Sequence, residues 1–209
     1  MERLVIAIDG PSGVGKSTLG KALARRFGYL FIDSGAVYRA VARKAIDAGV
    51  ALNDRATLAR IASEADVRLE GDPDNLRVFL DGREVTKEIR LPEASHASSV
   101  VATLPEVREA VVAKLREMSR AGGVVMDGRD IGTKVFPHAQ VKLFLEERQR
   151  GRDVTVEQIS RELAERDRRD RERDATPLVK APDAILIDTS AMPLDRVIER
   201  VLEIIQSRS

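Results

Sequence analysis

The chain has 209 residues, 43% hydrophobic and 33% charged, a composition that excludes a disordered protein and suits one α/β domain of ordinary size. Thirty-five basic and 34 acidic residues leave a net charge of +1, which argues against a dedicated nucleic-acid-binding protein. Without cysteine the chain has no disulfide or thiolate metal site. No apolar run approaches the roughly 18 residues that would span a membrane, and no signal peptide is recognisable. We therefore expect a soluble, cytoplasmic protein that acts on neither membranes nor nucleic acid.

Five short aliphatic runs are typical of strands buried on both faces, at residues 4–8, 29–32, 124–126, 141–145 and 184–187. Amphipathic patterns between them predict helices at 17–27, 37–48 and 105–120, and a last helix that Pro193 opens. Gly28 is placed as the C-cap of the first helix. This alternation predicts an α/β fold of three layers, in which helices cover both faces of a five-stranded parallel sheet.

Two stretches interrupt the alternation. Residues 67–85, VRLEGDPDNLRVFLDGREV, predict a small antiparallel insertion with a turn at Asp81 and Gly82. Residues 146–174 hold nine arginines and ten acidic residues, which on its own indicates a solvated helix with i,i+4 ion pairs. Helical periodicity changes this interpretation, because one face collects Ile159, Leu163, Arg166, Asp170 and Arg173, with Arg169 beside it. The core-facing side of this helix therefore ends in arginines.

Residues 10–17, GPSGVGKS, match the phosphate-binding pattern GxxxxGK[ST] at every constrained position. The motif follows an expected strand and opens an expected helix, as the chemistry requires. Its glycines let backbone amides turn toward phosphate oxygens, and the helix N-terminus favours negative charge. Lys16 can reach the β- and γ-phosphates, and the Ser17 hydroxyl suits Mg²⁺. A glycine-rich turn without a ligand is the weaker interpretation, so we expect a nucleoside triphosphate to bind here.

Other polar residues fall at the same edge of the expected sheet. Ser34 is a plausible N-cap after the second strand, and Arg39, one turn later, can face back over that edge. Asp127, Arg129 and Asp130 follow the third strand, where acids and an arginine beside a phosphate-binding loop suggest Mg²⁺ support and anion binding. The guanine-reading sequence NKxD is absent, which weakens a GTPase interpretation.

The chain resembles bacterial cytidylate kinases, nucleoside monophosphate kinases that transfer phosphate from ATP to CMP or dCMP. The matching segments are IDGPSGVGKST, DSGAVYR, the VxxxPxVR-like residues 101–108, DGRDIGTxVFP, ERDRRDRERDATPL and the C-terminal run PDAILIDTSAMPLDRVIERVL. Together these motifs are specific, whereas the phosphate-binding loop alone occurs in many unrelated enzymes.

The resemblance implies roles by matched position. The residues implied to hold ATP are Gly10, Pro11, Ser12, Gly13, Val14, Gly15, Lys16, Ser17 and Thr18. Those implied to seat the monophosphate are Ser34, Tyr38 and Arg39, with Arg39, Arg129 and Arg173 on its phosphate. Ser99, Arg108 and Asp130 match cytosine-reading positions, and Arg166 and Asp170 match positions near the ribose. Mg²⁺ is implied at Ser17 and, through water, at Asp127, and catalysis at Lys16, Arg129, Arg166, Arg169 and Arg173.

The resemblance also implies an organisation of the chain as a monomer. The core would comprise residues 1–33, 104–145 and 175–209, the CMP-binding part residues 34–103, including the small sheet, and a mobile lid residues 146–174. One departure concerns the lid, because Leu145 runs almost directly into EERQRGRDVTVEQ where relatives have a longer arginine-rich segment. We expect weaker ATP binding or turnover unless Arg148, Arg150 or Arg152 substitutes for the missing arginines.

These assignments agree with the chemistry of phosphoryl transfer. The acceptor phosphate is already anionic, so no general base is needed, and catalysis is positioning plus cancellation of charge repulsion. Two other classes remain open: a P-loop kinase for another monophosphate or a small metabolite, and a nucleotide-dependent binding protein whose arginine-rich segment docks a partner. The near-neutral charge and scarce aromatic residues disfavour an RNA partner.

Overall fold

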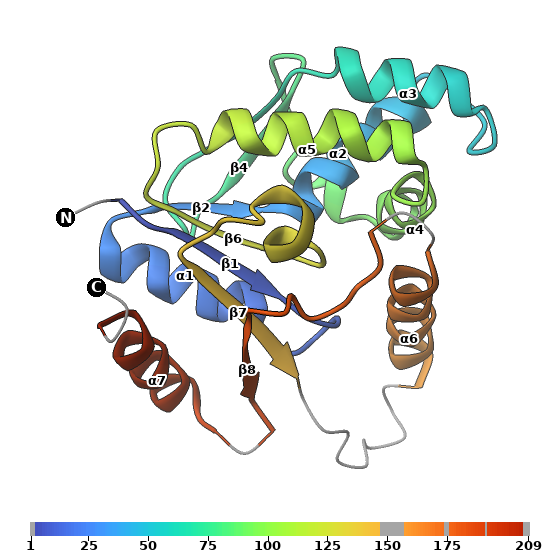
Figure 1. Ribbon diagram of the computed structural model, residues 1–209. Coiled ribbons are helices and arrows are strands. Elements are labelled where there is room, and N and C mark those ends of the chain that lie inside the picture. The colour runs from blue at the N-terminus through green and yellow to red at the C-terminus, as the bar shows by residue number, and fades with distance from the viewer. Residues whose placement is uncertain (1–2, 147–156, 174–175, 191, 207–209) are drawn as a thin grey trace.

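The computed structural model describes residues 3–146, 157–173, 176–190 and 192–206. Its centre is a five-stranded parallel sheet in the order β2-β6-β1-β7-β8 (Figure 1). The strands are β1 (Val5–Asp9), β2 (Leu30–Asp33), β6 (Val124–Gly128), β7 (Val141–Glu146) and β8 (Ile185–Asp188). They lie within a few residues of the five aliphatic runs, so the predicted α/β class and parallel sheet are confirmed.

The two faces of the sheet are covered by different helices. Alternate residues of β1 point to opposite faces, so Ile6 and Ile8 pack with α1 (Lys16–Phe27) and α7 (Leu194–Gln206). Ala7 points the other way, toward the core formed with α2 (Ser34–Asp47), α3 (Arg55–Glu64) and α5 (Pro105–Met118). Figure 1 shows α1 and α7 on one side of the sheet and α2 and α5 on the other. The result is three layers with a separate apolar core on each face.

A smaller unit follows α3. Strands β3 (Val67–Glu70), β4 (Arg77–Leu80) and β5 (Arg83–Glu84) form the expected antiparallel sheet, in the order β3-β4-β5. Asp81 and Gly82 join β4 to β5 with φ angles of 49° and 83°. Two successive positive φ values match the twist of a tight hairpin, which explains the Asp-Gly pair.

Short helical elements position the remaining functional segments. The turn η1 (Glu88–Arg90) leads into α4 (Pro92–Val101), and the single-turn π-helix η2 (Ile131–Val135) follows β6 directly. The charged helix α6 (Glu157–Glu172) stands beside α4, away from α1 and α7 (Figure 1). Within the described parts of the chain, no helix combines the length and apolarity needed to cross a bilayer.

Helix boundaries confirm one expected cap and correct another. Gly28 ends α1 in the left-handed conformation, φ 64°, as expected. The prediction that Ser34 caps the next helix was wrong, because the N-cap of α2 is Asp33, whose carboxylate accepts a hydrogen bond from the amide of Ala36 at 3.1 Å. Ser34 is instead the first helical residue, and its hydroxyl donates to the carbonyl of Asp127 at 2.7 Å. This contact ties the start of α2 to the end of β6.

Candidate active site

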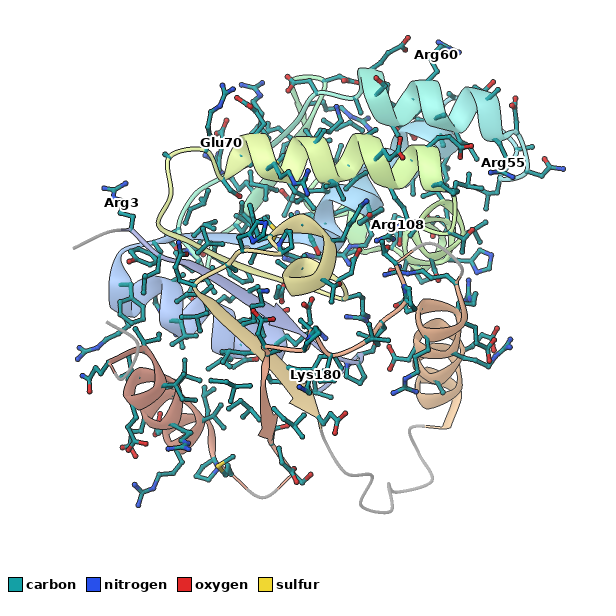
Figure 2. The ribbon with its side chains drawn as sticks, in the orientation of Figure 1. Arg3, Arg55, Arg60, Glu70, Arg108 and Lys180 are labelled. Atoms are coloured by element: carbon teal, nitrogen blue, oxygen red, sulfur yellow. The ribbon has the colours of Figure 1, made fainter. Side chains whose placement is uncertain are left out.

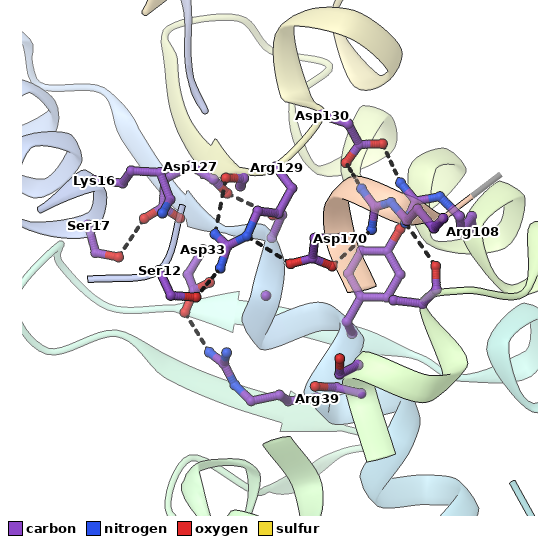
Figure 3. Close-up of a pocket in the computed structure, with 18 of the residues that line it drawn as sticks. Ser12, Lys16, Ser17, Asp33, Arg39, Arg108, Asp127, Arg129, Asp130 and Asp170 are labelled. Carbon is purple, nitrogen blue, oxygen red and sulfur yellow. Dashed lines mark hydrogen bonds and ion pairs between the residues drawn. The ribbon is translucent and has the colours of Figure 1, made fainter. Parts of the chain in front are cut away.

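A cavity of about 330 Å³ opens at the carboxyl ends of β1, β2 and β6. It joins two polar regions, one around the loop between β1 and α1 and the other between α4, α5 and α6 (Figure 3). The residues that line it are Ser12, Gly13, Lys16, Ser17, Asp33, Ser34, Gly35, Tyr38, Arg39, Ser98, Ser99, Ala102, Arg108, Asp127, Gly128, Arg129, Asp130, Asp170 and Arg173. Most residues that the sequence suggested for the site therefore share one cavity.

The loop at residues 10–15 needs its glycines. A Cβ on Gly10 would lie 2.3 Å from the carbonyl oxygen of Leu145, so a side chain there would collide with the backbone of β7. Gly15, with φ 90°, is the N-cap of α1 and supplies no side-chain cap. The first amides of α1 thus need another acceptor, which is the arrangement that binds anions at helix N-termini.

Lys16 and Ser17 turn from this loop toward the ends of the neighbouring strands. The largely buried Lys16 donates from Nζ to the carbonyl of Pro11. Ser17 donates from its hydroxyl to Oδ2 of Asp127 at 2.5 Å. A hydroxyl and a carboxylate beside a loop for phosphate form the oxygen-only set that Mg²⁺ uses when phosphates and water complete its coordination. The residues present therefore fit this ion.

Three acids end adjacent strands at this edge of the sheet. Asp127 on β6 is paired in register with Asp33 on β2, and Gly128 with Asp9 on β1. Asp127 is only 3% exposed, and burial together with the Asp33 carboxylate raises its pKa to about 7. Ser17, Lys16 and Arg129 act in the opposite direction. A further cation beside Asp127 would stabilise the ionised form of this carboxyl group.

Asp9, the acid that ends β1, has a structural role. Its two oxygens accept hydrogen bonds from the amides of Ile131 and Gly132, both at 2.8 Å. These amides begin η2, so the acid fixes the backbone directly after Asp130 to the strand that enters the phosphate-binding loop. Burial raises the pKa of Asp9 to about 6, although both amide hydrogen bonds lower it.

Arg129 connects the loop to helix α6 (Figure 3). Its Nη2 donates to the hydroxyl of Ser12 at 2.6 Å, and its Nε donates to Oδ2 of Asp170 at 3.0 Å. Asp167, one turn before Asp170, accepts the amide of Ser12 with both carboxylate oxygens, at 2.9 and 3.0 Å. Arg39 is held on the other side of the cavity by Asp33, at 2.7 Å.

The far end of the cavity is a buried ion cluster. Arg108 of α5 is paired with Asp130 and also donates to the carbonyl of Ala102 at 3.0 Å. Arg173 lies 3.5 Å from Asp130 and 3.4 Å from Asp170. Burial and the neighbouring Arg108 lower the pKa of Arg173. Tyr38 faces the Arg108 guanidinium at 5.7 Å, and burial raises the pKa of its phenol to about 12.

Some hydrogen-bond donors of this cluster could bind a ligand. Among the described residues, the Ser99 hydroxyl and Nε of Arg108 are buried without a hydrogen-bond acceptor, and Nη2 of Arg173 has the 3.5 Å ion pair with Asp130 but no hydrogen bond. Buried polar groups rarely stay unsatisfied, so such a group indicates a missing partner. All three belong to the set that the sequence suggested, and all three side chains line the cavity.

Other suggested residues lie outside this cavity. Arg169 is on α6 with Nε 3.7 Å from Glu165, while the side chain of Arg166 lies outside the described residues, as do Arg148, Arg150 and Arg152. Val14, Gly15 and Thr18 line a second cavity of about 260 Å³ on the other side of the loop, with Leu145, Thr189, Met192 and Val197. This second cavity contains residues that sequence reasoning missed, since Thr189 and Met192 lie in the matched C-terminal run but were given no role.

Asp33 and Asp167 were also missed as site residues. Asp33 had a visible signal, because it ends a strand beside the motif residues that follow it. Asp167 lies in the matched segment ERDRRDRERDATPL, but nothing in that segment indicated its partner Ser12, which is 155 residues away in the chain.

A phosphate-binding loop at the carboxyl edge of a parallel sheet, beside a cavity lined with arginines and acids, defines a P-loop nucleotide-binding protein of the kinase type. Residues 6–207 match the family model described as cytidylate kinase. The chain belongs to the cytidylate kinase family, which confirms the resemblance read from its motifs.

Curated relatives agree along the whole chain. The cytidylate kinase of Pelotomaculum thermopropionicum is 50% identical, with 94% of this chain and 93% of the relative covered. That of Geobacillus thermodenitrificans is 43% identical, with coverage of 99% and 98%. That of Bacillus subtilis is 41% identical over 221 aligned positions, with coverage of 100% and 99%. These positions outnumber the 209 residues of the chain, so the relative has residues without a counterpart here.

Proposed function

We propose that this protein transfers a phosphoryl group from ATP to CMP and dCMP, giving ADP and CDP or dCDP. The observation that carries the proposal is the cavity itself, which has a phosphate-binding loop at one end and the Arg108–Asp130 pair at the other. A monomer is proposed as the active form.

ATP is assigned to the loop at residues 10–18, with its base toward the second cavity. The apolar side chains there, including Leu145 and Val197, suit a flat heterocycle, and Thr189 adds a polar group. Mg²⁺ at Ser17 and Asp127 would neutralise charge on the phosphates that bridge the two substrates. Lys16 would exchange the Pro11 carbonyl for phosphate oxygens.

CMP is assigned to the far end. Cytosine presents an amine donor beside a ring nitrogen and a carbonyl acceptor, and Asp130 accepts while Arg108 and Ser99 donate. Uracil replaces the amine with a carbonyl and the ring acceptor with a donor, so its carbonyl oxygen would face the Asp130 carboxylate in place of a donor. Asp170 and Arg166 are proposed near the ribose, and Ser34, Tyr38 and Arg39 are proposed to seat the monophosphate.

Catalysis then consists of alignment and charge cancellation. Arg129 and Arg173 are close enough to the loop and the ion cluster to bind the acceptor phosphate and, with Lys16, the transferred group. Arginine suits this task because its planar fork binds phosphate through two parallel hydrogen bonds. Arg166 and Arg169 on α6 are proposed to complete the charge when residues 146–174 act as a lid over residues 34–103 and the core.

A coupled assay of ADP release tests the substrate assignment. CMP and dCMP should each support Mg²⁺-dependent turnover at least 100-fold above UMP, AMP and shikimate. Turnover mainly with AMP or shikimate would reject the assignment to CMP in favour of another P-loop kinase activity. ATP binding without turnover on any acceptor would favour a nucleotide-dependent binding protein.

A further inference from the structure

Helix α6 contacts the phosphate-binding loop through an acidic side chain. Asp167 places both carboxylate oxygens on the amide of Ser12, and its side chain is only 12% exposed. Ser12 is the third residue of the GxxxxGKS loop, whose backbone amides are turned toward an anion. An acid of the protein thus occupies one of the backbone donors of this loop.

Arg129 completes this contact. Its Nη2 lies 3.5 Å from Asp167 and donates to the Ser12 hydroxyl, so carboxylate, amide and guanidinium satisfy one another at the mouth of the loop (Figure 3 shows Arg129 reaching Ser12). Charge-assisted hydrogen bonds of this kind are about twice as strong as neutral ones. We call the contact of Asp167 with Ser12 and Arg129 the α6 latch.

We propose that Asp167 is an internal competitor of the terminal phosphate of ATP, and that the α6 latch must open before the triphosphate is fully bound. This inference rests on the proposed function, in which the loop takes ATP. A phosphate and a carboxylate on one amide would bring two anions within about 4 Å, where their repulsion opposes joint occupancy. Triphosphate binding transfers the Ser12 amide and Arg129 from Asp167 to phosphate oxygens.

Two consequences follow. The closed latch lowers the apparent affinity for ATP, because only the open fraction of the protein is competent to bind. Together with the hydrogen bond from Arg129 to Asp170, it also keeps α6 next to the loop in the nucleotide-free protein. Asp167 therefore acts on ground-state binding of the triphosphate rather than on the transfer step.

Isothermal titration of Mg²⁺-ATP and of inorganic triphosphate into the full chain tests this proposal. Asp167→Ala should bind both ligands about fivefold to tenfold more tightly than the wild type, and Asp167→Asn should gain less because its amide oxygen still accepts. The matched control is Glu172→Gln, which removes one negative charge from the same helix. Glu172 pairs with the exposed Arg168 at 2.8 Å, so this variant should stay within twofold.

Unchanged or weaker binding by folded Asp167→Ala would overturn the latch, as would an equal gain in Glu172→Gln. A ¹⁵N spectrum gives a second measurement, in which the Ser12 amide signal should shift in both Asp167 variants and not in Glu172→Gln. Wild-type protein that binds no ATP would defeat the proposed function itself. If the wild type releases ADP with CMP but Asp167→Ala binds ATP no more tightly, the latch is wrong and the proposed function stands.

Discussion

The two ends of the cavity are built in different ways. The phosphate-binding end uses one continuous loop, residues 10–18, and one acid from the end of a neighbouring strand, Asp127. The far end draws Tyr38, Ser99, Arg108, Asp130 and Arg173 from five separate segments. Arg108 and Asp130, only 3% and 7% exposed, form a buried ion pair there, whereas the similarly buried Lys16 and Asp127 are hydrogen-bonded to a backbone carbonyl and a hydroxyl. Figure 2 shows Arg108 inside the fold, whereas Arg55 and Arg60 project from α3.

Function and stability should therefore be separable at the phosphate-binding end and coupled at the far end. In the proposed function, backbone amides bind phosphate at the loop, so we expect the Lys16 side chain to be replaceable with little cost to the fold. Burying an ion pair removes both charges from water, and the attraction between them offsets this desolvation cost. Removing one member leaves the other charge buried without compensation, which destabilises the fold. Substitutions at the two ends should therefore affect different measurements.

The largest effect is expected at the loop. Lys16→Ala should lower kcat/KM by about 1,000-fold or more, which corresponds to roughly 4 kcal/mol of transition-state stabilisation. The free energy of unfolding should change little. Lys21→Ala on the same helix is the matched control in the assay of ADP release. Loss of less than tenfold in Lys16→Ala would contradict the assigned role.

The far end should respond in stability and in CMP binding together. Asp130→Asn leaves Arg108 and Arg173 facing each other without their shared acid, and should cost about 3 kcal/mol in urea unfolding. Adding Arg108→Met removes this repulsion and should recover part of the stability. CMP affinity should fall about 100-fold in the single and double variants alike. Recovery of CMP affinity in the double variant would show that the pair does not read the base.

Asp9 ends β1 directly before the loop and binds the first amides of η2. Its pKa is raised to about 6 in the folded protein, so the neutral form is favoured by folding. The protonated Asp9 therefore adds to the free energy of unfolding. This contribution is complete below about pH 4, near the ordinary pKa of an aspartate, and is lost as pH rises through 6. Between pH 4.5 and 7.5, the wild type should lose about 2 kcal/mol more unfolding free energy than Asp9→Asn does. Parallel pH profiles for the two proteins would contradict the assignment.

The smallest effect is expected for an ion pair outside the cavity. Arg60 and Glu64 of α3 lie 3.4 Å apart and are both more than half exposed. Replacing either residue with Ala should change the free energy of unfolding by less than about 0.5 kcal/mol, because water screens the pair. A cost comparable to that of Asp130→Asn would mean that burial does not explain the difference between the two sites.

Local patterns predicted the parts of the fold whose causes are local. Aliphatic runs located the strands, and the loop motif located its own turn and helix. Helices α3 and α4 were not predicted, and α4 shows why, since its sequence PEASHASSVV has serines where an apolar stripe would fall. The cap of α2 was misassigned because Asp33 and Ser34 are both good capping residues, and the contact of Ser34 with Asp127 decides between them.

Only those residues of the site that belong to recognisable motifs could be predicted from the sequence. Family motifs supplied Arg108, Asp130 and Arg173 as residues, but their proximity depends on how α5, β6 and the segment after α6 pack. The contact of Asp167 with Ser12 left no trace in the sequence, because an acid in a charged helix is ordinarily solvated. The shortened connection after Leu145 falls largely at residues 147–156, outside the described residues, so its predicted effect on ATP binding remains a prediction.

The proposed function requires ATP at the loop and CMP at the far end of the first cavity to be bound at the same time, with their phosphates end to end. Titration with cytidine and adenosine joined 5′ to 5′ through five phosphates tests it most directly. We predict one molecule bound per chain, at least 100-fold more tightly than ATP or CMP alone, because the second half binds at high effective concentration. Two molecules per chain, or an affinity no better than that of ATP, would contradict the account.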